Sequence, residues 1–398
     1  MPGEAKKMPT ERPIRVLCQL RAMLHGGIET WLMHIFRHAD RRAVRFDIAV
    51  ETREPCSYDE EARQLGVRLL PCMHSRQPWR YARQLGQILH QYGPYDVVHG
   101  HSYLYSGLIL RTAAKCGVSK RIAHIHPDVD QRPDTFARKV YRRIMTRWLS
   151  QYATDVVSPS LSSLNAFKTI CDCRRARTGI IPNIVDLDKF ERPVNRDAVR
   201  REFALPLDKP LVIYVARFSP HKNHEQFLRV AASINQGGRR VHFLIVGTDG
   251  PLLPEIRRRV SGRDDVSLLT GLDDVSRVMR AADLFFFPSL NEGFGVVAVE
   301  AAAAGLPVVA TNLSTIHEAC HPSMHRFMFE PNDDAKASES ILAILADNDL
   351  YQRLSRDGKL FASQFSATES LRKLMLLYTG VQDATPEDSC ATSGLRAA

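Results

Sequence analysis

A glycine-rich stretch in the second half of the sequence lies between two glutamates. The segment NEGFGVVAVE carries Glu292 near its start and Glu300 at its end. A carboxylate inside an apolar helix is unfavourable unless a polar partner receives it. Unpaired N–H groups at the helix start, from Phe294, Gly295 and Val296, suit a phosphate, and Glu300 follows at a distance that suits the hydroxyls of a ribose. The pattern predicts a site for a phosphorylated sugar or nucleotide. The alternative is a helix cap at Glu292 and a solvated or locally paired Glu300.

Two cations lie upstream of this stretch. The segment ARFSPHKN places Arg217 at the end of an apolar strand and Lys222 just before a helix expected to begin at about Asn223. Two positive side chains at a strand end can hold a diphosphate and stabilise it as it departs. Ligands of open parallel sheets bind beyond the carboxyl ends of the strands, so both segments are expected at one sheet edge. A solvated pair of surface cations is the alternative interpretation.

Composition indicates a soluble globular protein. The chain has 398 residues, of which 44% are hydrophobic and 25% charged, which is enough for two or three domains. No apolar run approaches the roughly 20 residues that span a bilayer, and the polar N-terminus lacks the apolar core of a signal peptide. Eight cysteines are scattered without CxxC pairs. We therefore expect reduced thiols and a cytoplasmic location.

The positive charge is concentrated in the first half. Residues 1–190 contain 30 Lys and Arg against 18 Asp and Glu, whereas the remainder contains 24 against 26. A basic half predicts an anionic partner, but no nucleic-acid motif accompanies it, so we expect no nucleic acid. Residues 135–157, TFARKVYRRIMTRWLSQYATDVV, form a basic amphipathic pattern suited to an anionic membrane surface. A core helix with a solvated basic face is the alternative.

Short apolar strands alternate with helical patterns along most of the chain. Such strands, spaced by helices, are typical of parallel sheets that are covered on both faces. Their number exceeds one sheet, so the expected fold class is α/β, with two Rossmann-like, doubly wound domains. The expected parts are a flexible N-terminus at 1–13, a first domain at 14–185, a second at 186–361 and a disordered tail at 381–398.

Together these motifs resemble one known family. Glu292-x7-Glu300 within PSLNEGFGVVAVEAAAAGLPVVAT, with ARFSPHKN upstream and IPNIVDLDKF at the joint, is similar to the retaining family-4 glycosyltransferases of GT-B fold. The resemblance implies two domains facing across a cleft, with a helix at about 362–379 packed back on the first. It also implies transfer of a sugar from a nucleotide-diphosphate sugar to a glycan or polyprenyl-diphosphate-linked glycan. The branch it is most similar to builds exopolysaccharide, capsule or O-antigen.

The resemblance also assigns roles to residues. Glu292 would contact the donor sugar, Glu300 the ribose, and Arg217 and Lys222 the diphosphate, with no metal or other cofactor. The remaining donor-binding residues would be Gly26, Gly27, Gly247, Phe294, Gly295 and Val296. Gly26 and Gly27 lie in MLHGGIET, where N–H groups at a helix start would face the cleft; a plain turn is the alternative.

Histidines gather at two strand ends, His99 and His101, then His124 and His126. Residues two apart on a strand share a face, and neutral imidazoles hydrogen-bond sugar hydroxyls. The resemblance places His126 against the transferred sugar as a catalytic residue and makes His101 and His124 contacts to sugar or acceptor. A structural role for His99 and His124 is the alternative.

Three other functions fit parts of the sequence. The histidines, with Asp128 and Asp130 nearby, could bind a divalent cation in a metal-dependent hydrolase. We expect no metal, because the family stabilises its leaving group with cationic side chains. An inactive nucleotide-sugar-binding protein and a nucleotide-sugar epimerase share the two-domain architecture.

Overall fold

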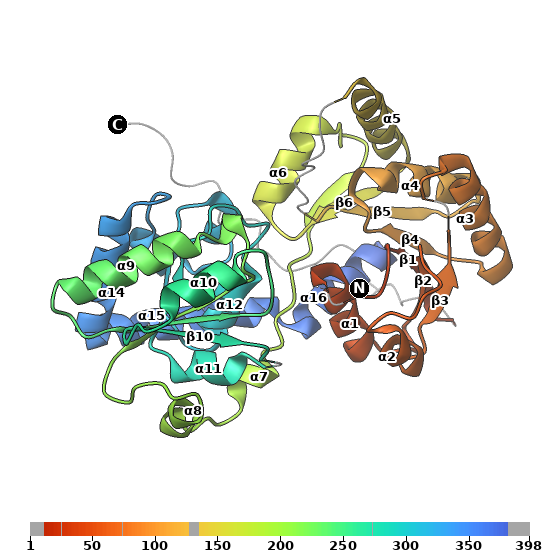
Figure 1. Cartoon of the computed structure of the whole chain (residues 1–398). Coiled ribbons are helices and arrows are strands. Elements are labelled where there is room, and N and C mark those ends of the chain that lie inside the picture. The colour runs from red at the N-terminus through yellow and green to blue at the C-terminus, as the bar shows by residue number, and fades with distance from the viewer. Residues whose placement is uncertain (1–11, 25, 74, 127–134, 273, 381–398) are drawn as a thin grey trace, which may run out of the picture.

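The computed structural model describes residues 12–24, 26–73, 75–126, 135–272 and 274–380. In this part the chain forms two α/β domains, each built around one parallel sheet (Figure 1). The predicted fold class is therefore confirmed. The segments predicted to be a flexible N-terminus and a disordered tail lie largely outside the described residues.

The first domain contains a seven-stranded sheet in the order β3-β2-β1-β4-β5-β6-β7. Its strands are β1 (Ile14–Gln19), β2 (Val44–Val50), β3 (Arg68–Pro71), β4 (Val97–Gly100), β5 (Lys120–His124), β6 (Asp155–Ser158) and β7 (Arg177–Ile180). The strand order reverses between β1 and β4, and such a switch point opens a crevice at the carboxyl ends of the strands. The histidine-bearing strands β4 and β5 lie beside that point.

Helices cover both faces of this sheet. One face packs against α1 (Gly27–His38), α2 (Asp59–Gln64) and α16 (Ala367–Thr379), and the other against α3 (Pro78–Tyr92), α4 (Ser106–Lys115), α5 (Phe136–Tyr152) and α6 (Leu161–Ile170) (Figure 1). Tyr378 of α16 is buried in the core on the first face. The strands are consequently apolar on both sides, as buried parallel strands must be.

The second domain contains a five-stranded sheet in the order β10-β9-β8-β11-β12. Its strands are β8 (Leu211–Val215), β9 (His242–Gly247), β10 (Val266–Thr270), β11 (Leu284–Phe287) and β12 (Val308–Ala310). The switch point lies between β8 and β11, which pair in parallel. The strand before ARFSPHKN and the strand before NEGFG are therefore neighbours, and their loops emerge at the same edge.

The helices of the second domain form two covering layers and a connection to the first. They are α7 (Asp188–Glu191), α8 (Arg196–Glu202), α9 (His224–Gln236), α10 (Leu253–Val260), α11 (Ser276–Ala281), α12 (Val296–Ala303), α13 (Ser314–His317), α14 (Asp334–Ala346) and α15 (Asn348–Ala362). The resemblance implied a helix at about 362–379 packed back on the first domain, and α16 lies at this place. Helix α15 ends at Ala362, and Ser366 caps α16 by accepting the N–H of Glu369, a capping-box sequence that begins a new helix.

Within the described residues, no helix has the length and apolar character needed to cross a membrane.

Candidate functional site

The glutamate loop leads from β11 into α12 through a glycine in the left-handed region. Gly295 has φ 87° and is the N-terminal residue before α12. A Cβ atom there would lie 3.3 Å from the ring of Phe287, in a conformation that other residues rarely adopt. No side chain caps this helix start. The first N–H groups of α12, in the segment of Phe294 and Val296, are thus not used by a capping side chain and can receive an anion.

The cation loop meets the glutamate loop directly. The Nζ atom of Lys222 lies 2.5 Å from Oε1 of Glu292, with side chains only 18% and 9% exposed. Two further hydrogen bonds fix the junction, from Leu290 N–H to the His221 carbonyl at 2.8 Å and from the Tyr214 hydroxyl to the Lys222 carbonyl at 2.6 Å. The structure therefore brings Lys222 and Glu292 together, as predicted. That these two residues bind a ligand stays a prediction.

Arg217 lies at the same sheet edge but is held more loosely. Its Nε atom is 3.3 Å from Asp249, and both side chains are about three-quarters exposed. Exposed pairs of this kind contribute little to stability, so the guanidinium is free to exchange Asp249 for a phosphate. Gly247 opens the same loop, and a Cβ there would come within 2.3 Å of the Ala216 carbonyl oxygen. Close packing of β9 against β8 therefore requires glycine at this position without any ligand.

Glu300 lies one turn into α12, between the domains' connecting segment and the glutamate loop. Burial raises its pKa to about 7, and Lys189 partly opposes that rise, whereas Asp186 and Asp274 add to it. The carboxyl group of Glu300 therefore changes its ionisation near neutral pH. Asp186 and Lys189 both lie in IPNIVDLDKF, at the joint between the domains, and no sequence signal links them to a glutamate so far along the chain.

The four histidines at the ends of β4 and β5 form one stack. Ring centroids lie 4.2 Å apart for His124 and His126, and 4.3 Å apart for His99 and His101. Nδ1 of His101 is 3.0 Å from Nε2 of His126, and Nδ1 of His99 is 2.9 Å from the hydroxyl of Tyr378. Of the four, only His126 is partly exposed. The predicted contacts of His101 and His124 with a sugar stay predictions, and in this structure both side chains are buried.

The stack is held uncharged by its surroundings. Burial lowers the pKa of His99 and of His126 to about 3, and it lowers the pKa of His101 and His124 well below the usual value. Trp31 of α1 packs edge-on against His124, with centroids 5.0 Å apart. Neutral imidazoles in a closed stack can donate and accept hydrogen bonds, but they do not take up protons near neutral pH.

Two groups in this stack have the composition of a metal site. The donor atoms of His101, His124 and His126 lie within 4.8 Å of one another, as do those of Cys18, His99 and His101. Imidazole and thiolate ligands suit Zn²⁺. Asp128 and Asp130, which we considered as further ligands, lie outside the described residues. These two groups of residues could therefore hold a metal ion. That the protein uses no metal stays a prediction.

The glycines of the first domain lie at the start of α1. Gly26 is extended at φ −139°, and a Cβ there would meet only the flexible side chain of Glu29. A Cβ on Gly27 would have no described atom within 4 Å. Packing within the described part thus gives no reason for glycine at Gly27, whereas the close approach of a ligand would. Its donor-binding role stays a prediction.

The domains touch through residues that lie outside the predicted site motifs. Glu318, after α13, accepts the N–H groups of Leu161 and Ser162 at the start of α6, at 2.5 and 2.7 Å. The hydroxyl of Ser163 donates to the carbonyl oxygen of Gly293 at 3.3 Å. The first domain thus contacts the glutamate loop itself. An isolated glutamate far along the chain gives no sequence signal for such a contact.

Comparison with known proteins agrees with this architecture. Residues 25–189 match the model of Glycosyltransferase Family 4, and residues 195–361 match that of Glycosyl transferases group 1. The putative glycosyltransferase EpsF of Bacillus subtilis is 31% identical over 309 residues, which are 76% of this chain and 80% of EpsF. An Escherichia coli enzyme, UDP-Gal:alpha-D-GlcNAc-diphosphoundecaprenol alpha-1,3-galactosyltransferase, is 25% identical over 71% of this chain and 75% of its own.

Solved structures show the same fold. The crystal structure of Anabaena HepE in complex with UDP superposes with a TM-score of 0.76 at 19% identity, covering 93% of this chain and all of HepE. At this identity, the likeness to HepE shows only a shared fold. The matches to the two family models and to EpsF are matches of sequence, and the two models together cover both domains. With two facing Rossmann-like domains and the convergent lysine and glutamate loops, the chain belongs to the family-4 glycosyltransferases of GT-B fold.

Proposed function

We propose that this glycosyltransferase takes its sugar from a nucleotide-diphosphate sugar and transfers it with retention of configuration. The observation that carries the proposal is the junction of Lys222 with Glu292 beside the uncapped start of α12. This junction brings together a cation and helix N–H groups, which suit a diphosphate, and a carboxylate, which suits sugar hydroxyls. Structures of HepE with UDP and with UDP-glucose support a uridine diphosphate sugar as the donor.

The proposed reaction uses positive charge where the leaving group forms. Lys222, Arg217 and the start of α12 stabilise the departing diphosphate as the bond between the sugar and the phosphate oxygen breaks. The acceptor hydroxyl bonds to the sugar carbon from the same face and passes its proton to the leaving phosphate oxygen, so configuration is retained. No separate general base is needed. Glu292 and His126 would orient the sugar, and Glu300 would hold the ribose.

We propose a lipid-linked glycan as the acceptor and cell-surface polysaccharide synthesis as the setting. The name of the E. coli relative gives a sugar on diphosphoundecaprenol as its acceptor, and this chain is similar to that enzyme and to EpsF. Such an acceptor would be met at the cytoplasmic face of the membrane. We also propose that transfer needs no metal, because cationic side chains already supply the charge that a metal would supply.

A donor screen with three readouts tests the proposal. Nucleotide-sugars that bind the folded chain raise its melting temperature, and we expect a uridine diphosphate sugar to do so. With cell-envelope lipid extract as acceptor, we expect labelled sugar to enter the lipid fraction in the presence of EDTA. Binding without transfer would indicate an inactive binding protein, and donor conversion without any acceptor would indicate an epimerase. Loss of transfer with EDTA, restored by a metal, would overturn the metal-free mechanism.

A further inference from the structure

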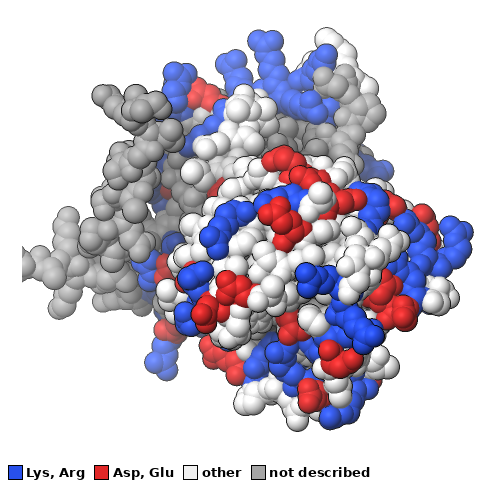
Figure 2. Space-filling model, turned by 90° about the vertical axis from the view of Figure 1, so that its left-hand side faces the viewer, with Lys and Arg blue, Asp and Glu red and all other residues white. Residues whose placement is uncertain are grey.

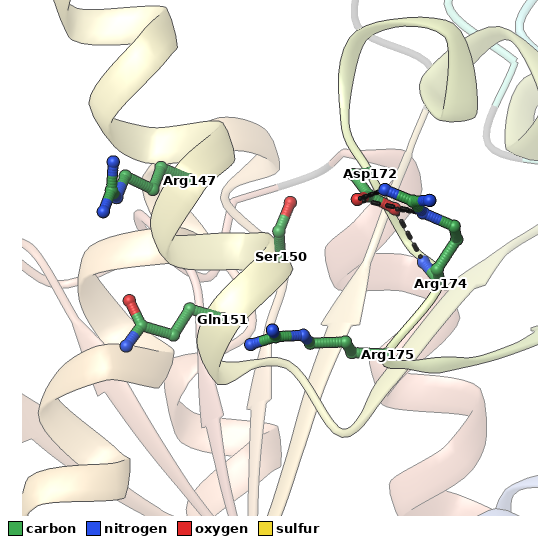
Figure 3. A pocket seen from close by; sticks show the side chains of 6 residues that line it. All are labelled: Arg147, Ser150, Gln151, Asp172, Arg174 and Arg175. Atoms are coloured by element: carbon green, nitrogen blue, oxygen red, sulfur yellow. Dashed lines mark hydrogen bonds and ion pairs between the residues drawn. The ribbon is translucent and has the colours of Figure 1, made fainter.

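One surface of the first domain lies apart from the site described above and combines arginines with exposed apolar side chains. It lies where α5 packs beside α6 and the loop that follows α6. A cavity of about 600 Å³ opens there. The cavity is lined by Arg147, Ser150, Gln151, Asp172, Arg174 and Arg175, and we call it the arginine cavity (Figure 3).

The charges in the arginine cavity are unbalanced. Arg174 binds the carboxylate of Asp172 at 2.8 Å and folds back on it, whereas Arg175 extends toward Gln151 of α5 (Figure 3). In the part of the chain that the structure describes, neither Arg147 nor Arg175 has an acidic partner within 4.0 Å. Three guanidinium groups therefore meet one carboxylate. Guanidinium groups with free donors bind phosphate oxygens in pairs of hydrogen bonds.

An apolar stripe leads along α5 to this cavity. Phe136, Val140 and Ile144 are 83%, 41% and 39% exposed, and they recur every four residues on one face of the helix. Arg147 continues the same stripe at its cavity end. Ile170, at the end of α6 just before the loop with Asp172, is 51% exposed. Large apolar side chains exposed together mark a contact surface.

We propose that this surface docks on an anionic bilayer, with the apolar stripe in the membrane interface and a lipid phosphate in the arginine cavity. Charge complementarity carries the choice of partner, because a net positive cavity beside an apolar stripe matches the phosphate layer above the acyl chains. A nucleic acid would match the arginines but would leave Phe136 and Ile144 in water. The inference concerns the membrane alone and stands independently of the donor chemistry.

Vesicle sedimentation of the full chain tests the docking surface. We expect binding to vesicles of phosphatidylcholine with phosphatidylglycerol and much weaker binding to phosphatidylcholine alone. The double substitution Arg147→Gln/Arg175→Gln should lower partitioning about twenty-five-fold, at about fivefold for each arginine near the surface. The matched control is Arg257→Gln/Arg258→Gln on α10, which removes the same charge from exposed positions of the second domain. On the second domain, which faces the viewer in Figure 2, positive and negative side chains are intermingled. Partitioning of the control should stay near that of the unchanged protein.

A second pair of variants separates membrane docking from simple charge attraction. Phe136→Ser/Ile144→Ser should lower partitioning about tenfold, whereas Leu360→Ser, at another exposed apolar position on α15, should not. If the serine double variant binds as well as the unchanged protein, the surface is purely electrostatic, as for a nucleic acid, and the proposal fails.

Soluble phosphates distinguish the source of the anion. Inorganic phosphate or diphosphate that raises the melting temperature through Arg147 and Arg175 would indicate a soluble ligand and overturn the membrane assignment. Equal partitioning of the arginine double variant and its α10 control would overturn it as well. The melting-temperature shift with a uridine diphosphate sugar should be the same in all these variants, so failure here is distinguishable from failure of the proposed transfer reaction.

Discussion

At the scale of single residues, the candidate site contains two pairs of oppositely charged side chains. Lys222 and Glu292 hold each other at 2.5 Å, and Arg217 is held loosely by Asp249. If a diphosphate binds at this sheet edge as proposed, both cations already lie there, and little reorganisation would be required. The structure therefore favours a site that is arranged before the substrate arrives.

Replacing Lys222 with Ala should affect turnover more than donor binding. The charge of Lys222 counts most when the diphosphate departs, so we expect turnover to fall by about a hundredfold and donor affinity to fall much less. Steady-state kinetics together with donor titration would measure both quantities. The Lys359→Ala variant, at an exposed lysine of α15, serves as the control. Equal losses in affinity and turnover would contradict a role in leaving-group stabilisation.

Glu300 should make nucleotide binding dependent on pH. Its pKa is raised to about 7 by burial, so the carboxyl is protonated in the folded protein below that pH and can no longer accept both ribose hydroxyls. We expect affinity for uridine diphosphate to fall about tenfold between about pH 8 and about pH 6. Calorimetric titration would measure it, and Glu300→Gln should remove this part of the dependence. The same slope in both proteins would show that Glu300 does not contact the nucleotide.

The raised pKa of Glu300 also bears on stability. The folded state binds this proton more tightly than the unfolded chain does. At low pH Glu300 is therefore neutral and does not lower the free energy of unfolding. Its unfavourable buried charge develops as pH rises from the unfolded pKa through about 7. A bound ribose would offset that cost, so donor binding should stabilise the protein most on the alkaline side.

At the scale of elements, strand ends and helix starts place the chemistry. Strands β8 and β11 are neighbours across the switch point, and β4 and β5 pair in register with His99 opposite Ile122. Each pair of strand ends therefore presents its loops at one edge. The αL conformation of Gly295 then turns the chain into α12 with its first N–H groups uncapped.

The histidine stack at the ends of β4 and β5 should make the protein sensitive to acid. The pKa of each ring is lowered in the folded state, so below the unfolded value of about 6.5 the unfolded chain takes up protons that the folded chain does not. Each imidazole then costs the folded state about 1.4 kcal/mol per pH unit. Melting temperature should fall steeply between about pH 6.5 and about pH 5.

A matched pair of variants attributes this acid loss to the stack. His124→Asn removes one titrating ring from the buried stack and should make the loss of melting temperature shallower. His90→Asn, at an exposed position of α3, should leave the slope unchanged. If both variants retain the slope of the unchanged protein, the acid sensitivity has another origin.

At the scale of the whole molecule, the two domains are joined by the connecting segment and by contacts across the site. Val185 N–H donates to the Phe365 carbonyl at 2.9 Å where the chain passes between domains. On the other side, Glu318 binds the start of α6, and Ser163 reaches the carbonyl of Gly293. The glutamate loop is thus held by the domain opposite to its own.

Glu318→Ala should loosen this arrangement. Without the carboxylate, two N–H groups at the start of α6 lose their partner, at a cost of about 1–2 kcal/mol. We expect the radius of gyration measured by small-angle X-ray scattering to increase and kcat/KM to fall about tenfold. Glu330→Ala, which removes a carboxylate bound to Asn312 of its own domain, is the control. A Glu318 variant with unchanged scattering and kinetics would show that the contact does not hold the domains.

The sequence by itself determined the fold class and the loops that carry the site. Continuous apolar strands separated by helices specify parallel sheets covered on both faces, and NEGFG and ARFSPHKN follow two such strands. These features are local, because strand patterning and glycine conformation depend on neighbouring residues. The start of α16 is local as well, because Ser366 and Glu369 form a capping-box sequence.

Only the tertiary structure decided which side chains meet. The pairing of Lys222 with Glu292, the stacking of four histidines, the effect of Lys189 on Glu300 and the reach of Glu318 to α6 join residues far apart in the chain. The periodicity of apolar residues along the sequence contains no information on such distances. These distances depend on the order of strands in each sheet and on the orientation of one domain relative to the other. Burial follows from the same packing, and it is the largest cause of the raised pKa of Glu300 and of the lowered pKa of His124.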